Sequence, residues 1–420
     1  MSKNINIILV SALYLPEPHV SAHMSSNLAY YLAEQGHCVT VLCPQPSRPL
    51  GADYSKHKYA LKQDITSENK VNVVKLSSFT APESHLILRI QESYSFGRAV
   101  VKYLTALKDL PDILYINSWP LLSQTIIARF AKANKIPMVL QVMDIYPESL
   151  TSKLPFLFRS LVHRPLKLLD TWIAETAAVI VVISENMRRT YTESRRIPSD
   201  RVITIPTWQN DSLFEHGHDR ISACKHYNIP ADYFTFLFLG NIGPVAGIEF
   251  LIHAFQKASI DDSQLVIIGD GSSKADCIKL VEQLNASNIH FISDPDAANV
   301  PLLQSMAHVC MLPMKKGSGL SSIPSKLPAY LFSTKPVLAT VDSESDTARL
   351  IQEAECGWVG APEDLDWLSD KLRNISTTSP ITLNTLGQNG RIFGLKYFSK
   401  SKCIAQLAQV IVSASLDELK

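Results

Sequence analysis

The feature that most constrains the fold is an alternation of short β-branched runs with helical patterns, which occurs twice along 420 residues. Such runs are typical of buried strands in a parallel sheet, where a helix returns the chain between neighbouring strands. In the first half, the predicted strands are residues 5–12, 38–43, 71–76, 113–117, 138–142, 178–183 and 201–205. The pattern starts again after Phe214, with predicted strands at 234–239, 265–268, 289–292, 309–313 and 337–340.

The repeated pattern indicates two domains, because a chain of this length exceeds the usual size of one. We expect an α/β fold class, with two Rossmann-like, doubly wound parallel-sheet domains that face a cleft. Residues 1–208 form the first predicted domain and residues 209–395 the second. A C-terminal helix is predicted within 396–420, with packing back on the first domain as one option. The polar segment 44–69 is predicted to be an excursion loop.

Composition excludes several classes of protein. The net charge of +1 gives no global attraction to nucleic acid, and no basic stripe with interleaved aromatic residues indicates one. Seven cysteines lack the spacing of a disulfide framework or a zinc site, and Cys38, Cys43 and Cys310 are expected to be buried in strands. No apolar run reaches the roughly 18 residues that span a membrane, and Asn4 and Asn6 interrupt the stretch that most resembles a signal peptide. We expect a cytoplasmic protein in a reducing environment, with no bound metal and no nucleic-acid partner.

Two glycine turns follow neighbouring strands of the second half. The first contains Gly240, Asn241 and Gly243, and its exposed backbone N–H groups and following helix suit a diphosphate. The alternative is a tight turn that needs glycine only for positive φ. In the second turn, Gly269 and Gly271 would let another loop approach the ligand. Its Asp270 either accepts a hydrogen bond from a ligand hydroxyl or caps the next helix.

A third loop, residues 315–326, combines small residues, hydroxyl groups and a lysine at the start of a helix. Its candidate donor-binding residues are Ser321, Ser322, Pro324 and Ser325, followed by Lys326. Such a loop is a second possible anion site. Three loops of this kind at strand ends in one half predict that the second domain holds a nucleotide diphosphate.

These motifs resemble glycosyltransferase family 4, the large retaining GT-B family. The likeness rests on residues 240–255, the turn 269–271, and the segments 324–326 and 335–340. In the first half, residues 14–18, 32–41, 144–149, 183–187 and 203–206 are similar to the same group. The resemblance covers nearly the whole chain in order, and is strongest to bacterial O-antigen, capsule and colanic-acid enzymes, including N-acetylfucosaminyl-type transferases.

The resemblance implies a hexosyltransferase-type enzyme that takes a sugar from a nucleotide-diphosphate donor, with UDP as the expected nucleotide. It implies that residues 1–208 bind the acceptor, a polyprenyl-diphosphate-linked saccharide, and residues 209–395 bind the donor. It also implies that there is no cofactor or catalytic metal. Retention would follow front-face attack, with the leaving phosphate helping to deprotonate the acceptor.

Several positions depart from the family pattern. Many members carry an arginine and a lysine on the donor phosphates where this chain has Asn241 and Ala246. The two glutamates of the family fall on Ser321 and Ala329, and alanine cannot bind the donor ribose. Lys326 is therefore the candidate replacement cation and one of two predicted catalytic residues.

The second predicted catalytic residue is Asp144, which the resemblance places near the reaction centre. It could bind an acceptor hydroxyl or support charge on the donor sugar, and its alternative role is a cap before Pro147. Glu148 is a candidate acceptor-binding residue, although acids are ordinary in a first helical turn. His19 and His23 are expected in the loop after the first strand, either as acceptor-binding residues or as solvated histidines.

Residues 153–169 contain Arg159, Arg164 and Lys167 among large apolar residues and lack acids. Such a segment can lie on an anionic membrane surface, which would make the protein peripheral on the inner face of the cell membrane. The alternative is an amphipathic helix packed on the sheet, and this alternative is preferred for a similar segment at 85–104.

Two further functions stay open at this point. A nucleotide-sugar 2-epimerase also uses two Rossmann-like domains, but it needs acid–base carboxylates and a histidine in the donor cleft. A non-catalytic GT-B scaffold subunit is the other, supported by Asn241, Ala246 and Ala329.

Overall fold

The computed structural model describes residues 4–48, 64–66, 70–81, 86–117, 121–148, 156–294, 296–320 and 323–416. The chain divides into two compact units. Unit 1 comprises Met1–Pro206 and Cys403–Lys420, and unit 2 comprises Thr207–Lys402. The division lies between Pro206 and Thr207, and the segment Cys403–Lys420 belongs to unit 1.

Unit 1 is built on an eight-stranded sheet with the order β3-β4-β2-β1-β5-β6-β7-β8 in the described residues. All neighbouring strands pair in parallel except β3 and β4, which are antiparallel. The strands are β1 (Asn6–Ser11), β2 (Cys38–Pro44), β3 (Asp64–Thr66), β4 (Val71–Leu76), β5 (Ile113–Asn117), β6 (Met138–Val142), β7 (Val179–Val182) and β8 (Val202–Thr204). The helices are α1 (Val20–Glu34), α2 (Leu86–Thr105), α3 (Leu121–Ala133), α5 (Phe156–Thr176), α6 (Glu185–Arg189) and α15 (Lys400–Ser415). A π-helical turn (Thr190–Ser194) and a 3-10 turn (Ser199–Arg201) follow α6.

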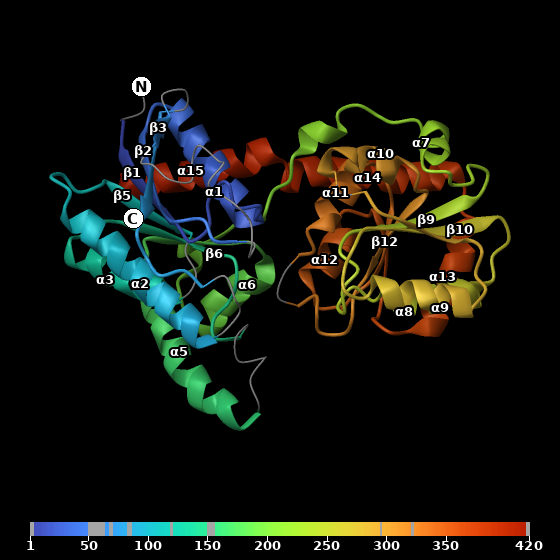
Figure 1. The fold of residues 1–420 in the computed structure, drawn as a ribbon, viewed down its shortest axis with the longest axis horizontal. Helices are drawn as coiled ribbons and strands as arrows, with labels where there is room; N and C mark the ends of the chain where they lie inside the picture. The colour runs from blue at the N-terminus through green and yellow to red at the C-terminus, as the bar shows by residue number, and fades with distance from the viewer. Residues whose placement is uncertain are drawn as a thin grey trace. The chain divides into compact units, whose positions relative to one another are not determined.

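The sheet of unit 1 is covered on both faces, which explains why its strands are apolar almost throughout. In Figure 1, α2, α3 and α5 lie on one side of the sheet, and α1 and α15 lie on the other. Apolar side chains from α2, α3 and α5, such as Val100, Ile127 and Ile173, pack in one core with β5 and β6. Helix α15 buries residues at helical spacing, among them Ile404, Leu407 and Ile411, and belongs to unit 1.

Unit 2 is a six-stranded parallel sheet with the order β11-β10-β9-β12-β13-β14 in the described residues. Its strands are β9 (Phe234–Leu239), β10 (Ser263–Ile268), β11 (Ile289–Ile292), β12 (Val309–Pro313), β13 (Val337–Thr340) and β14 (Gly357–Gly360). Its helices are α7 (Arg220–His226), α8 (Ile248–Ala258), α9 (Lys274–Gln283), α10 (Val300–Ser305), α11 (Lys326–Phe332), α12 (Asp346–Glu353), α13 (Leu365–Ser376) and α14 (Pro380–Tyr397). Short 3-10 turns lie at Asp211–Phe214 and Ala297–Asn299. Helices α8, α9 and α13 lie on one side of the sheet in Figure 1, and α10, α11 and α14 on the other.

Each unit has a point where the strand order reverses. In unit 1 the chain places β2 on one side of β1 and β5 on the other, and in unit 2 it places β10 and β12 on either side of β9. The loops that leave the carboxyl ends of such strands diverge to opposite faces, which opens a crevice for ligands. The switch point therefore predicts where each unit binds its ligand.

Every strand expected from the sequence is present, and the described ranges contain two more. The first is β3, within the segment expected to be an excursion loop, of which most residues lie outside the described ranges. The second is β14, whose four residues include two glycines. A Cβ at Gly357 would lie 1.9 Å from the carbonyl oxygen of Val337, so glycine marks a close strand pairing here.

Two local expectations were wrong. Helix α1 begins at Val20, so His23 lies in a helix and not in the preceding loop, and His19 is the N-cap residue of that helix. Cys38, expected to be buried, is exposed at the start of β2, because the first residue of the strand lies at the sheet margin. The expectation that the segment 85–104 packs on the sheet is confirmed, because Phe96, Val100 and Leu104 of α2 lie in the core of unit 1. Ile87, Ile90 and Tyr94 of the same helix are exposed.

Candidate functional site

The two glycine turns of unit 2 interlock at the carboxyl ends of β9 and β10. Gly269 has φ +136°, and a Cβ there would lie 2.1 Å from the carbonyl oxygen of Gly240. A Cβ at Gly271 would lie 2.3 Å from the carbonyl oxygen of Ile242. The Ile242 N–H also donates to the Asp270 carbonyl oxygen at 2.9 Å. Glycine is required because the two backbones touch, so the turns form one surface.

Lys326 lies directly beside this surface. A Cβ at Gly240 would lie 3.3 Å from Lys326 Nζ, and Nζ is 4.0 Å from the centroid of the Phe238 ring. Tyr330, one turn further along α11, fixes the helix beneath β9, since its hydroxyl accepts from Leu239 N–H at 2.9 Å. Lys326 is partly buried and has no carboxylate partner among the described residues.

Burial lowers the pKa of Lys326 to about 8, because a desolvated ammonium is disfavoured. An unpaired, partly desolvated cation beside exposed backbone N–H groups is suited to an anionic group. Ala246 and Ala329, where the family carries a lysine and a glutamate, are both buried and supply no charge. The structure therefore brings the predicted lysine to the predicted glycine turn.

The other predicted donor residues are placed as follows. The Asp270 carboxylate pairs with Lys274 at 2.7 Å, and the Lys274 hydrogen bond lowers the pKa of Asp270; no cap bond from Asp270 to a helix N–H is present. Asn241 is exposed, and its side-chain amide would be 3.0 Å from a Cβ at Gly243. Ser325 is exposed just before α11, and its carbonyl oxygen accepts from the Gln209 side chain. Pro324 precedes it, partly exposed, whereas Ser321 and Ser322 lie outside the described residues.

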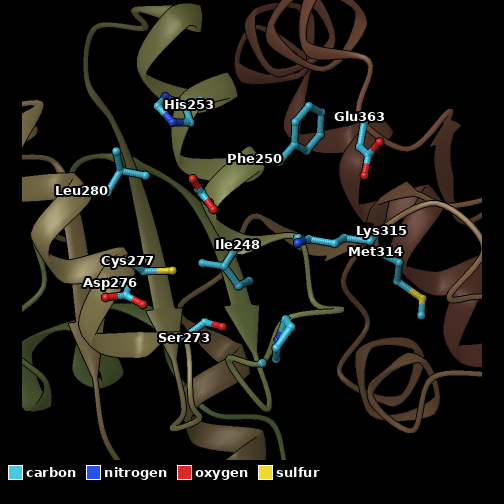
Figure 2. Close-up of a pocket in the computed structure, with 14 residues that line it drawn as sticks. Ile248, Phe250, His253, Ser273, Asp276, Cys277, Leu280, Met314, Lys315 and Glu363 are labelled. Carbon is cyan, nitrogen blue, oxygen red and sulfur yellow. The ribbon is translucent and has the colours of Figure 1, made fainter. Parts of the chain in front are cut away.

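A pocket of about 560 Å³ adjoins the glycine turns. Figure 2 shows Ile248 and His253 of α8 on the side of Cys277 and Leu280 of α9, and Phe250 of α8 on the side of Glu363. The Lys315 side chain extends into it from the loop after β12 (Figure 2). Gly243 and Gly247 also line this pocket. Sequence reasoning had placed Lys315 in the third loop without assigning it a role, since a lysine in a polar loop gives no distinct signal.

Unit 1 has a pocket of about 280 Å³ at its own switch point, where β1, β5 and β6 end. Its described lining brings together His19, a predicted acceptor-binding residue, and Asp144, a predicted catalytic residue. Asp144 is exposed in the turn after β6, and its charge adds to burial in raising the pKa of Tyr146 to about 12. Burial lowers the pKa of His19, whose Nδ1 lies 2.8 Å from the Ser21 hydroxyl. His23 is exposed on α1 and is not among the lining residues.

Glu148 lies in an ion-pair network behind this pocket. The fully buried Arg195 guanidinium donates to both Glu148 carboxylate oxygens at 2.7 Å and to Asp170 at 3.0 Å. The Tyr191 hydroxyl donates to the other Asp170 oxygen at 2.9 Å. Burial raises the pKa of Asp170 to about 6 despite the Arg195 charge. For Glu148, burial also opposes ionisation, but the bonds from Arg195 outweigh it and lower the pKa.

Sequence reasoning missed this network because its members come from separate elements. Tyr191 and Arg195 reach Asp170 of α5 together because the chain takes a π-helical turn at Thr190–Ser194. Such turns are rare and concentrate at functional sites. The pocket lining includes both Asp170 and Tyr191.

The segment predicted to meet a membrane is only partly described, since residues 153–155 lie outside the described residues. In α5, Leu166 and Leu169 pack against the core, whereas Arg164 and Leu168 are exposed. None of the helices in the described part of the chain combines the length and apolar character that membrane crossing needs. Across the same residues, no three His, Cys, Asp or Glu side chains gather as potential metal ligands.

Two Rossmann-like units in one chain, each with a candidate site at the carboxyl ends of its parallel strands, are typical of the GT-B class of protein, and solved structures share the fold. HepE of Anabaena in complex with UDP matches with a TM-score of 0.69 at 13% identity, over 97% of this chain and 100% of that one. Residues 23–211 match Glycosyltransferase Family 4, and residues 219–393 match Glycosyl transferases group 1. The chain therefore belongs to the glycosyltransferases, with a family 4 domain followed by a group 1 domain.

Two bacterial relatives are similar to this chain. WbjE of Pseudomonas aeruginosa, named as a glycosyltransferase, is 26% identical over 252 residues, which are 59% of this chain and 61% of that protein. The alignment thus spans less than two thirds of WbjE. WcaI of Escherichia coli K12, named as a colanic acid biosynthesis glycosyl transferase, is 22% identical over 364 residues, 83% of this chain and 86% of that protein.

Proposed function

We propose that this protein transfers a sugar from a UDP-linked donor to a polyprenyl-diphosphate-linked saccharide, with retention at the anomeric carbon. The product would enter a bacterial surface polysaccharide such as an O-antigen or a capsule. The name of WcaI, a colanic acid biosynthesis glycosyl transferase, supports the polysaccharide role. Structures of HepE with UDP and with UDP-glucose support the choice of donor nucleotide.

The observation that carries the proposal is the position of Lys326 beside the glycine turn. The Lys326 ammonium is close to Gly240 and has no carboxylate partner among the described residues. A donor diphosphate at this turn would receive backbone N–H groups from one side and a positive charge from the other. Lys326 would thereby take the place of the charged residues that positions 241 and 246 lack.

The proposed reaction places each charge where the fold can support it. The acceptor hydroxyl oxygen forms a bond to the anomeric carbon while the bond from that carbon to the diphosphate oxygen breaks. The hydroxyl proton passes to the leaving phosphate, and Lys326 stabilises the negative charge that develops there. We propose that these groups act without a metal ion or cofactor.

On the acceptor side, we propose that Asp144 and His19 meet the acceptor, because both line the pocket of unit 1. Glu148 would act through Arg195, which holds its carboxylate, and so would position the loop after β6. His23, exposed on α1, would meet only a longer acceptor that extends beyond the pocket.

We also propose that the protein is peripheral on the inner, cytoplasmic face of the membrane. Arg164 and Leu168 on α5 are exposed, as are Ile87 and Ile90 on α2. Exposed large apolar residues near bases suit an anionic lipid surface, which the segment 153–169 would contact.

Calorimetry with UDP tests the donor assignment. Wild type should bind saturably, and Lys326→Ala should weaken binding by about 1–3 kcal/mol, the range for losing a charged hydrogen bond. Lys279→Ala removes the same charge from an exposed position on α9 and should leave UDP binding unchanged. Absence of UDP binding to folded wild type, or equal binding by wild type and Lys326→Ala, would contradict the proposal.

A further inference from the structure

The pocket of unit 1 contains a buried side-chain amide in which the oxygen has a hydrogen-bond partner and the nitrogen has none among the described residues. Gln141, at the end of β6, is 2% exposed and lines the pocket. Its Oε1 accepts from the Tyr115 hydroxyl, which fixes the amide orientation. Its Nε2 is buried and has no partner among the described residues. A buried amide donor without an acceptor is unfavourable, so an acceptor atom of a bound ligand would relieve that penalty.

The neighbouring polar groups of the pocket are held in place and keep spare acceptor capacity. Asn117 donates its amide nitrogen to Ser25 Oγ at 3.0 Å, which leaves the side-chain carbonyl oxygen to accept. The Tyr191 hydroxyl donates its hydrogen to Asp170, so the hydroxyl oxygen can still accept a hydrogen bond from a ligand. The pocket therefore offers one donor and at least two acceptors on fixed side chains, a pattern that matches neighbouring sugar hydroxyls.

The charge of the pocket excludes a diphosphate as its occupant. The described lining residues include the carboxylates of Asp144 and Asp170 and no lysine or arginine. Arg195, behind the wall, is already neutralised by Glu148 and Asp170. A diphosphate would meet like charge here, whereas a hydroxyl group can donate to a carboxylate.

The remaining lining and the size fit one ring. Leu121, Val142 and Tyr146 supply apolar surface on which the C–H face of a sugar can lie. The volume of about 280 Å³ lies just below the ~300–1,000 Å³ typical of small-molecule sites. A single monosaccharide is the largest unit that this pocket would enclose.

We infer that this pocket binds one uncharged sugar ring, with Gln141 Nε2 donating to a ring or hydroxyl oxygen and Asn117 accepting from a hydroxyl. Assigning that ring to the acceptor rests on the proposed function. The terminal sugar of the acceptor, and not its diphosphate, is then what unit 1 recognises.

Saturation-transfer NMR tests the pocket without any nucleotide. The probes are the methyl glycosides of glucose, galactose, N-acetylglucosamine and fucose, with inorganic pyrophosphate as the anionic probe. At least one glycoside should give saturation transfer with wild type, and excess UDP should not remove it. Gln141→Leu should weaken that binding by about tenfold, the value of one neutral hydrogen bond.

The matched control is Gln304→Leu, which replaces a fully buried glutamine of α10 whose side-chain amide is also unpaired among the described residues. It should leave glycoside binding unchanged. If Gln141→Leu does not fold, Gln141→Glu keeps the oxygen facing Tyr115 and replaces only the free donor, and it should show the same loss.

Three results would overturn the inference. They are no glycoside signal with folded wild type, an unchanged signal in the folded Gln141 variants, or pyrophosphate binding that the same variants abolish. The donor proposal is judged separately, by UDP calorimetry. Glycoside binding without UDP binding would contradict the proposed donor and support the sugar site in unit 1. UDP binding without glycoside binding would support the donor and contradict the sugar site.

Discussion

The two units place their candidate sites at the same point of the same architecture and fill them with opposite chemistry. In unit 2 the edge consists of glycine backbone with Lys326 beside it. In unit 1 the edge consists of side chains, with two carboxylates and three amides and no lysine or arginine among the described lining. The comparison teaches that the doubly wound sheet fixes where a ligand binds, while the residues of the loops decide its charge.

The difference begins with glycine. The first glycine of the chain is Gly36, so the loop after β1 has side chains at every position. Unit 2 instead has three glycines at its first two turns whose Cβ atoms would meet another backbone or Lys326: Gly240, Gly269 and Gly271. Backbone N–H groups can approach a ligand most closely where side chains are absent, which suits a diphosphate in unit 2 and a neutral ring in unit 1.

The largest expected effect concerns the side-chain scaffold of unit 1. Arg195→Met should lower the free energy of unfolding by about 3–5 kcal/mol, because it leaves the buried Asp170 carboxylate unpaired. Urea titration measures the loss. Lys257→Met is the control in unit 2, since Lys257 and its carboxylate partner Asp366 are 47% and 81% exposed. Its cost should stay below about 1 kcal/mol. Equal losses of unfolding free energy in the two variants would show that burial does not determine how much Arg195 contributes to stability.

The next effect concerns the backbone scaffold of unit 2. Gly269→Ala should destabilise the protein by about 2–3 kcal/mol, because the added Cβ meets the Gly240 carbonyl at a φ that alanine avoids. Gly317→Ala also has a positive φ but no atom within 4 Å of the added Cβ, and it should cost about 1 kcal/mol. Thermal and urea unfolding of both variants give the comparison. A Gly269 variant as stable as the Gly317 variant would mean that the two turns are not locked together.

The smallest expected effect is a pH dependence of ligand binding, which the cation of unit 2 should produce and the neutral site of unit 1 should not. The ammonium of Lys326 has a pKa of about 8 and is needed in its charged form, so UDP affinity should fall as pH rises through that value. Between pH 7 and pH 9 the protonated fraction falls by about tenfold, and affinity should follow it. Lys326→Arg keeps its charge and should bind UDP equally at both values. Calorimetry at the two pH values checks this, and a flat profile for wild type would remove Lys326 from the donor site.

The pH dependence that Lys326 gives to the free energy of unfolding has the opposite sign to the pH dependence it gives to UDP binding. Because the folded pKa of Lys326 lies below its usual value, the unfolded chain binds more protons between about pH 8 and 10.5. This residue alone therefore makes the fold more stable as pH rises through that interval. The pH dependence of binding and that of stability must be measured separately.

Much of the fold followed from local pattern. Residues 234–239 and 265–268 are apolar and short, and glycine turns follow both, so strand, turn and helix could be assigned together. The strand at Gly357–Gly360 was missed because two of its four residues are glycines, which are poor strand formers. The start of α1 was misplaced because His19 is an unusual N-cap, for which sequence rules favour serine, threonine, aspartate or asparagine.

The sequence by itself determined the two series of strands, the glycine turns and the lysine that opens α11, because these depend on periodicity and on backbone conformations that few residues adopt. Only the tertiary structure decided that Lys326 lies against Gly240, that Arg195 holds Glu148 and Asp170, and that Gln141 keeps an unpaired amide in a pocket. These contacts join residues far apart in the chain, and they form only when parallel strands bring their carboxyl ends to one edge. No local pattern records which side chains meet there, because crossover connections and packing set the neighbours.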